Sequence, residues 1–236
     1  MTLPRFAKAM VIVAHPDDAE FSVAGTVAKW AREGTKFVYV ICTDGSKGTD
    51  DPSLTPERLA PVREREQRAA AAILGVAEVV FLGHEDGTLQ PTLALRRDIA
   101  RQIRIHRPDA VFCPDPTTRF LRGEYINHPD HRAAGEAALC AVFPDARNRW
   151  QFPELLAEGL EPYAVRHVFL SASQSADTWI DIGETIEVKL AALAQHKSQA
   201  DATAPGAAEM VRGWARANAE GRGMAYAEVY KHIVLR

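Results

Sequence analysis

Two clusters of imidazole and carboxylate side chains stand out in this sequence. The first, His-Pro-Asp-Asp at 15–18, directly follows the apolar run 10–14. His15 and Asp18 offer nitrogen and oxygen donors that suit Zn²⁺, whereas Asp17 has no evident partner in the sequence. A catalytic zinc ion uses about three protein ligands, so this segment predicts a metal site that lacks one ligand. Taken alone, it is also compatible with a polar turn whose aspartate caps a helix.

The second cluster, residues 127–132, precedes an alanine-rich pattern that is typical of a helix. Pro129 suits the first position of that helix. His128 and His131 are three residues apart, so they share a helix face and can project toward the same point. One of them could bind a metal ion while the other acts on a substrate. Taken alone, this cluster is equally compatible with a polar helix N-terminus.

Short apolar runs alternate with longer segments of helical period in the first half of the chain. The predicted strands are 9–14, 37–43, 78–82 and 110–113, and the predicted helices are 23–33, 56–74 and 92–106. This alternation indicates an α/β fold, Rossmann-like, with a mostly parallel β-sheet flanked by helices on both faces. Ligands bind at the carboxyl ends of the strands in such a sheet, and the first cluster follows a strand.

The second half is less regular, and we expect one domain over residues 1–236. The pattern predicts helices over 129–143, 184–199 and 208–219, and strands over 165–172, 178–182 and 226–235. Three loops, 43–55, 114–127 and 144–162, are rich in Gly, Pro, Asp and Arg. Long loops of this kind commonly frame a site in an α/β protein.

Composition excludes some classes of partner. The formal net charge is −3, so the chain lacks the basic face that would bind nucleic acid. Neither an apolar leader nor a run of bilayer-spanning length is evident, so we expect a cytoplasmic protein with no membrane contact. Cys42, Cys113 and Cys140 show no metal-ligand or disulfide spacing, and we expect reduced thiols. The sequence leaves the oligomeric state open, a homo-oligomer included.

Together the two clusters resemble the PIG-L/LmbE deacetylase family, and further segments along nearly the whole chain agree. These segments are Ala24-Gly25-Thr26, Arg63-Glu64-Arg65-Glu66, Leu74-Gly75-Val76, Phe81-Leu82-Gly83, Asp86-Gly87, Lys189 and His196-Lys197-Ser198-Gln199. Two departures are also present. The family often has a glycine pair where this chain has Ala24-Gly25, and often a tyrosine where it has Ile126, although Tyr125 is adjacent.

The resemblance implies a Rossmann-like fold and one zinc ion, held by His15, Asp18 and His131. It further implies that Asp17 is the general base, and that His128 is the acid or oxyanion-stabilising group, oriented by Asp130. Zinc would lower the pKa of a bound water from about 15.7 toward about 7. Two histidines and one carboxylate also suit Fe²⁺, so the sequence does not separate the two metals.

The expected substrate is a small N-acetylated amino sugar, such as N-acetylglucosamine or a glycoside, which would release acetate and a free amine. The candidates for substrate binding are Arg63, Asp86, Arg122 and Tyr125, with Arg119 beside them. One alternative is a metal-dependent amidase for another N-acyl small molecule, either an antibiotic or a low-molecular-weight thiol intermediate. A second is a non-catalytic sugar- or nucleotide-binding module, although no GxGxxG follows the first strand.

Overall fold

Seven strands form one central sheet in the structure, a computed structural model that describes residues 3–121, 123 and 125–236. In order across the sheet they are β3 (Glu78–His84), β2 (Lys36–Thr43), β1 (Lys8–Val13), β4 (Ala110–Pro114), β7 (His167–Ser171), β9 (Ala227–Val234) and β8 (Thr178–Asp181). The first five are parallel, and β9 is antiparallel to both of its neighbours. The predicted mostly parallel sheet is therefore confirmed.

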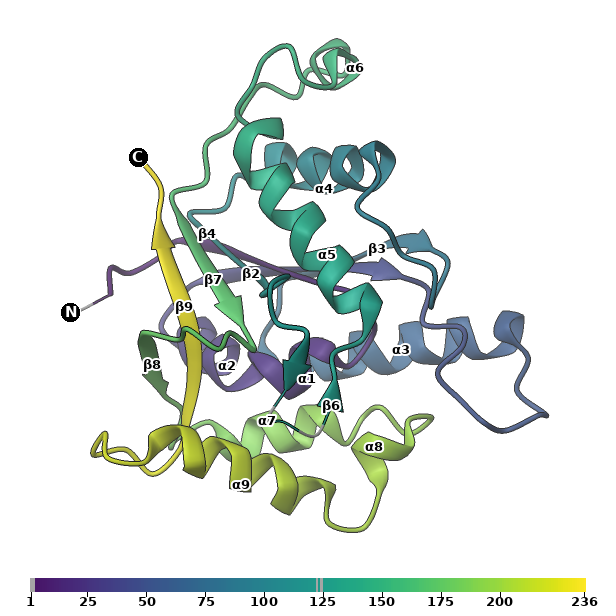
Figure 1. The fold of residues 1–236 in the computed structure, drawn as a ribbon, viewed down its shortest axis with the longest axis vertical. Coiled ribbons are helices and arrows are strands. Elements are labelled where there is room, and N and C mark those ends of the chain that lie inside the picture. The colour runs from purple at the N-terminus through teal and green to yellow at the C-terminus, as the bar shows by residue number, and fades with distance from the viewer. Residues whose placement is uncertain (1–2, 122, 124) are drawn as a thin grey trace.

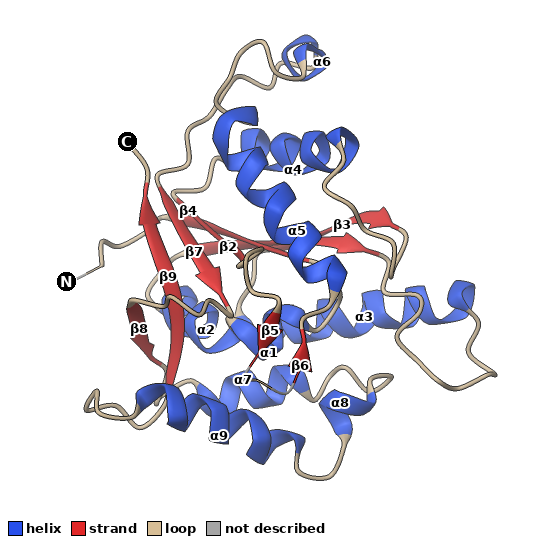
Figure 2. Ribbon diagram, viewed as in Figure 1, coloured by secondary structure: helices blue, strands red, loops and turns tan. Residues whose placement is uncertain are grey.

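Helices cover both faces of this sheet (Figures 1 and 2). They are α1 (Asp18–Ser22), α2 (Ala24–Arg32), α3 (Pro56–Leu74), α4 (Leu93–His106), α5 (Pro129–Cys140), α6 (Pro153–Ala157), α7 (Ile186–Leu193), α8 (Ala200–Thr203) and α9 (Ala207–Ala219). Helices α1, α2, α3, α7 and α9 pack on one face, while α4 and α5 pack on the other. None of these helices is long and apolar enough to cross a membrane.

Strand β1 lies in the middle of the sheet and is buried on both faces. Val11 and Val13 point into one apolar core, whereas Met10 and Ile12 point into the other. This follows from the alternation of side chains along a strand, and it explains why the run is apolar throughout instead of alternating with polar residues. The polar residues that follow β1 therefore emerge at the carboxyl edge of the sheet.

The structure differs from the predicted elements where short-range signals were weak. Helix α5 ends at Cys140 and continues as the π-helical segment Ala141–Asp145, in which Phe143 has φ −148° and ψ 121°. A residue before proline is pushed out of the helical region, and Pro144 follows Phe143. The small hairpin of β5 (Phe120–Leu121) and β6 (Tyr125–Ile126) was not predicted, because two-residue strands show no period.

A long loop such as 144–162 can frame a site or be an irregular connection, and here it is a connection. It follows the C-terminal end of α5 and packs against α4, far from the residue that begins α5 (Figure 1). The buried guanidinium of Arg104 in the last turn of α4 donates hydrogen bonds to five main-chain carbonyls of this region, Asp145, Ala146, Asn148, Gln151 and Leu160. These bonds give hydrogen-bond partners to the buried guanidinium and to the carbonyl groups of the loop. The role of the loop is therefore structural.

A buried carboxylate ties the C-terminal strand to the first helices. Glu228 of β9 accepts the backbone N–H groups of Gly25 and Thr26 at 2.9 and 2.7 Å, at the N-terminal end of α2. The Lys189 ammonium of α7 lies 2.6 Å from the same carboxylate. Unpaired N–H groups and a positive dipole end favour an anion at a helix N-terminus. Glu228 therefore joins α2, α7 and the sheet in one core.

Gly135 sets the distance between α5 and the sheet. A Cβ atom at this position would lie 2.2 Å from the carbonyl oxygen of Pro114 at the end of β4. That distance is far inside van der Waals contact, and the opposing atom belongs to the backbone and cannot rotate away. Helix α5 is therefore held in direct backbone contact with β4, which brings its N-terminus to the carboxyl edge of the sheet.

We expect Gly135→Ala to lower the free energy of unfolding by about 1–3 kcal/mol, because overpacking must displace α5 or β4. Gly213→Ala in α9 is the matched control, since nothing lies within 4 Å of a Cβ built there. That change should stabilise the protein by up to about 1 kcal/mol through helix propensity. Urea denaturation followed by circular dichroism measures both. Equal stability changes in the two variants would contradict the close approach of α5.

Candidate metal and catalytic site

The two clusters that stood out in the sequence meet at the carboxyl edge of the sheet. Residues 15–18 form the turn from β1 into α1, and His128 and His131 lie at the N-terminal end of α5. The ring centroid of His15 is 4.9 Å from that of His128 and 5.2 Å from that of His131. More than a hundred residues separate the clusters along the chain, and the packing of α5 on β4 brings them together.

His15, Asp18 and His131 form a group that could hold a metal ion, because each offers one ligand atom and these atoms lie within 4.8 Å of one another. His131 Nε2 is 3.0 Å from Asp18 Oδ1, and His15 Nδ1 is 3.6 Å from Asp18 Oδ2. Two imidazole nitrogens and one carboxylate match the three-ligand sets of catalytic metal sites, which keep a further position open. The donor chemistry therefore fits a divalent metal ion.

The other nitrogens of these two imidazoles are held by groups behind them. His131 Nδ1 is 3.0 Å from Asn127 Oδ1, while His15 Nε2 is 3.1 Å from an Asp86 oxygen and 3.3 Å from an Asp130 oxygen. Such partners fix the ring orientation and tautomer of metal-binding histidines. Sequence reasoning gave Asn127 no role, although its position four residues before His131 on the same helix start was a usable signal.

Asp130 occupies a different place from the one expected. Its carboxylate contacts His15 and accepts the backbone N–H groups of Gly87 at 2.7 Å and Leu89 at 3.2 Å. It orients His128 only through its own N–H, which donates to His128 Nδ1 at 3.2 Å. Although burial raises the pKa of Asp130, the hydrogen bonds from His15 and Gly87 outweigh it, so the pKa is lowered and the group is an anion.

His128 begins α5 as its N-cap residue, so the capping role suggested by the sequence is real. Its Nδ1 accepts a backbone N–H, which leaves Nε2 as the nitrogen that can carry a proton. Burial, and then the neighbouring His15 and His131, lower the pKa of His128. The Asp130 carboxylate acts to raise the pKa of His128, as a support for the protonated form would, but by less than burial and the two histidines lower it.

Asp17 is held in an uncommon backbone conformation, with φ 101° and ψ −27°. Positive φ in a residue other than glycine costs about 1–3 kcal/mol and persists only where the surroundings impose it. Its N–H donates to Gln67 Oε1 at 2.9 Å, and its carboxylate accepts from Arg63 Nη2 at 3.0 Å. The side chain makes no helix-cap hydrogen bond, so the simple capping alternative for this motif is not realised.

The pKa values of the adjacent Asp17 and Asp18 are shifted in opposite directions. Burial raises the pKa of Asp17 to about 6, with Arg63 opposing and Asp18 adding to the shift. Burial also acts to raise the pKa of Asp18, but the charge and hydrogen bond of His131 outweigh it and lower that pKa well below its usual value. Neighbouring carboxyls with divergent pKa values can take different roles, one accepting a proton and the other remaining an anion.

The residues expected to bind substrate lie in varied surroundings. Arg63 is 3% exposed and donates to the carbonyl oxygens of Pro16 and Gly45 as well as to Asp17, so it lies behind Asp17, bound to protein groups. Asp86 is 5% exposed and contacts His15. Burial acts to raise its pKa, but the hydrogen bond and charge of His15, the N–H of Lys47 and the charge of Arg63 together lower that pKa to about 2. Arg119 is exposed at the base of the β5–β6 hairpin.

Tyr125 is 55% exposed on β6, two residues before Asn127, where it is free to meet a ligand. Arg122 lies outside the described residues.

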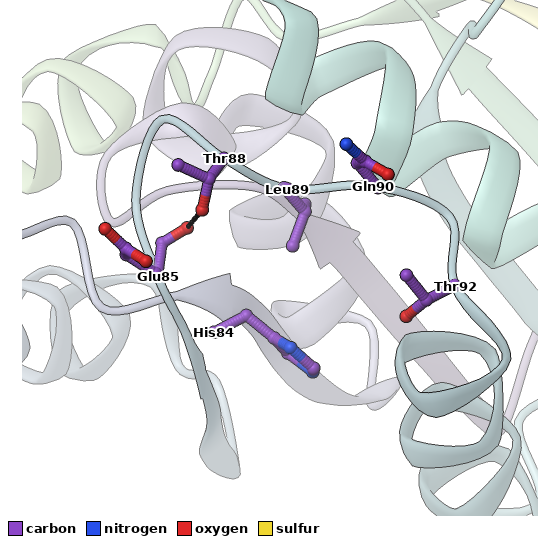
Figure 3. Close-up of a pocket in the computed structure, with 6 residues that line it drawn as sticks. All are labelled: His84, Glu85, Thr88, Leu89, Gln90 and Thr92. Carbon is purple, nitrogen blue, oxygen red and sulfur yellow. Dashed lines mark hydrogen bonds between the residues drawn. The ribbon is translucent and has the colours of Figure 1, made fainter.

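A pocket of about 170 Å³ lies next to the metal and catalytic site, at the point where the chain leaves β3. His84, Glu85, Thr88, Leu89, Gln90 and Thr92 line it (Figure 3). The imidazole of His84 is 3.2 Å from Asp98 of α4. Among the described residues, His84 belongs neither to the group of His15, Asp18 and His131 nor to the second metal-capable group, His15, His128 and Asp130.

Residues 10–142 match the family model described as GlcNAc-PI de-N-acetylase. A diacetylchitobiose deacetylase of Thermococcus kodakarensis is 35% identical over 192 residues, which are 81% of this chain and 70% of the relative. A 1D-myo-inositol 2-acetamido-2-deoxy-alpha-D-glucopyranoside deacetylase of a Nocardioides species is 27% identical over 260 aligned positions, covering 83% of this chain and 84% of the relative.

The fold is shared with a solved structure of the same kind. The N,N'-diacetylchitobiose deacetylase of Pyrococcus horikoshii superimposes with a TM-score of 0.87 at 31% identity, over 97% of this chain and 84% of that one. The family match includes both clusters and the strands and helices that position them. The chain therefore belongs to the PIG-L family of de-N-acetylases.

Proposed function

We propose that this protein is a zinc-dependent hydrolase that removes the N-acetyl group from an N-acetylglucosamine unit of a small molecule, releasing acetate and a free amine. The observation that carries this proposal is the convergence of His15, Asp18 and His131, with Asp17 and His128 beside them. The names of the relatives support the substrate class, since both describe deacetylases of N-acetylated glucosamine derivatives.

His15, Asp18 and His131 would hold the metal ion. When bound, the ion would polarise the amide carbonyl and lower the pKa of a water toward about 7. Zinc is the first choice because two histidines and one carboxylate form a common catalytic zinc set, and Fe²⁺ is the second. Asp130 and Asp86 would strengthen His15 as a ligand through its outer nitrogen, as carboxylates behind metal-bound histidines do.

Asp17 would act as the general base. Its pKa of about 6 leaves it mostly ionised at neutral pH, yet close enough to neutrality for it to accept a proton and then release it. Arg63 holds its carboxylate in place, and the uncommon backbone conformation directs the side chain away from the helix-capping position. Arg63 would therefore serve the reaction through Asp17 in addition to any contact with substrate.

His128 would stabilise the oxyanion by donating a hydrogen bond from Nε2, and the leaving amine would take its proton from Asp17, which accepts it from the attacking water. The Asp130 N–H occupies Nδ1, so His128 works as a neutral hydrogen-bond donor and not as an imidazolium. Donors aimed at a developing oxyanion are worth about 10²–10³ in kcat. Tyr125 and Arg119, at the neighbouring hairpin, stay candidates for sugar contacts, and so does Arg122, which lies outside the described residues. The single domain, the cytoplasmic location and the lack of nucleic-acid and membrane partners also stay predictions.

We expect the zinc-loaded protein to release acetate from N-acetylglucosamine or from its glycosides, with N,N'-diacetylchitobiose among the substrates tested. Asp17→Asn is the control, because asparagine tolerates a positive φ and removes only the base. Acetate is measured by a coupled enzymatic assay. If no acetate is released from any sugar but another N-acyl small molecule is hydrolysed, the amidase alternative would replace this proposal. If no amide is hydrolysed, the non-catalytic sugar- or nucleotide-binding module would be favoured.

The roles of the site residues can be separated by metal analysis. His131→Ala should lose the bound zinc, because two protein ligands remain of three. Asp17→Asn and His128→Ala should keep zinc and lose about 10²-fold or more in kcat, the range typical of acid–base and oxyanion groups. Mass-spectrometric metal content is measured beside the rates. Complete loss of zinc in Asp17→Asn would contradict the division between base and ligands.

The tautomer of His128 can be observed directly. We expect nitrogen-15 NMR of the imidazoles at pH 7 to show a neutral His128 with its proton on Nε2, because Nδ1 accepts the Asp130 N–H and the pKa is lowered. Comparison with His128→Gln assigns the signal. A proton on Nδ1 at this pH would rule out the proposed donor.

A further inference from the structure

The backbone of Asp17 is held by a side chain that the proposed mechanism does not use. Asp17 has a positive φ of 101°, and its N–H donates to Gln67 Oε1 at 2.9 Å. Gln67 lies in α3, fifty residues later in the chain, and is fully buried. An acceptor that is placed for this N–H favours the uncommon conformation over the ordinary one, provided that the amide of Gln67 is itself fixed.

A second contact fixes that amide. Gln67 Nε2 donates to both carboxylate oxygens of Glu20, each at 3.1 Å, and Glu20 is fully buried in α1. Because a carboxylate only accepts, Gln67 must present its NH₂ to Glu20 and its oxygen to Asp17. A flipped amide would face Glu20 with a second acceptor and leave two buried groups unpaired, which is costly.

The chain of contacts ends at His196, which follows α7. Its Nε2 is 3.1 Å from Glu20 Oε2, and both side chains are fully buried. His196 therefore supplies the donor that a buried carboxylate requires. Helix α7 packs against both α1 and α3 (Figure 1). The hydrogen bonds of His196, Glu20 and Gln67 therefore run from the segment after α7, through α1, to α3.

The segment around His196 also contacts α3 at Glu66, the residue before Gln67. Ser198 donates its N–H and its hydroxyl to Glu66 at 2.9 and 2.7 Å. Arg63, Glu66 and Gln67 are spaced by three and four residues, so they share one face of α3. Arg63 and Gln67 contact Asp17, whereas Glu66 accepts hydrogen bonds from Ser198. Glu66 can therefore serve as a control for substitutions of Gln67, because it lies on the same face of α3.

We propose that Gln67, Glu20 and His196 are positioning residues, which hold the backbone of Asp17 in the conformation that the deacetylation requires. None of the three belongs to the metal-capable groups among the described residues, so each acts through the next. The proposal rests on the general-base role proposed for Asp17. It assigns a task to the His196-Lys197-Ser198-Gln199 motif, which the chemistry of the site leaves unused.

Gln67→Met tests this chain in the zinc-loaded protein, because methionine has a similar length and lacks both amide groups. We expect NMR to show hydrogen exchange of the Asp17 amide at least about tenfold faster, since its acceptor is gone. We also expect kcat to fall by about 10- to 100-fold, because a misplacement of about 1 Å in a catalytic group can cost 10² in rate. KM and zinc content should stay unchanged.

Glu66→Gln is the matched control. It weakens the contact of the same helix face with the Ser198 segment without touching Asp17, Gln67 or Glu20. We expect both the Asp17 exchange rate and kcat to stay at the wild-type values in this variant. A loss of kcat equal to that of Gln67→Met would indicate a general effect of packing and would overturn the proposal.

A charge-conserving exchange provides the rescue. Gln67→Glu alone places two carboxylates in contact, and we expect it to lower kcat at least as much as Gln67→Met. Combining it with Glu20→Gln restores every donor and acceptor, because Asp17 donates to residue 67, residue 20 donates its NH₂ to residue 67, and His196 donates to residue 20. We expect the double variant to recover most of kcat and the slow exchange of the Asp17 amide.

The amide measurement does not depend on the reaction. Unchanged exchange at Asp17 in Gln67→Met would overturn the proposal whatever the activity, and so would faster exchange with unchanged kcat. Faster exchange in a protein whose wild-type form releases no acetate would support the positioning network and refute the proposed function instead.

Discussion

The contact between α5 and β4 at Gly135 is the constraint on which the site depends. Only a hydrogen atom fits between the helix backbone and the Pro114 carbonyl, so the helix cannot stand further from the sheet without leaving a gap. His128 and His131 begin this helix, and His131 Nε2 lies 3.0 Å from Asp18 at the end of β1.

Several carboxylates lie close together in the site, and each has hydrogen-bond donors. Asp18, Asp86 and Asp130 surround His15, and each carboxylate also accepts at least one backbone N–H from the segments that follow β1, β2 and β3. These bonds stabilise the anions in a buried place, where desolvation would otherwise neutralise them. Asp17 has fewer such donors, so burial dominates and its pKa rises. The same motif thus contains an anionic ligand and a carboxylate suited to proton transfer.

Support for the site extends through helices that carry no ligand. Helix α3 contacts Asp17 through Arg63 and Gln67, while the segment after α7 contacts α3 and α1 through Ser198 and His196. Glu228 ties α7 and α2 to the C-terminal strand. Hydrogen bonds therefore connect the C-terminal third of the chain, through α1 and α3, to a turn near the N-terminus.

The sequence by itself determined the sheet class, most strands and helices, and the two clusters of site residues, because apolar period and residue type are local properties. It did not predict the β5–β6 hairpin or the packing of loop 144–162 against α4, since these depend on contacts between distant segments. It also placed the end of the helix that begins at Pro129 at Phe143, whereas α5 ends at Cys140. The partners of Asp130, the neutral state of His128 and the support of Asp17 by Gln67 were also decided by tertiary structure. Hydrogen-bond partners and burial set these properties, and both arise only when strands, helices and loops far apart in sequence pack together.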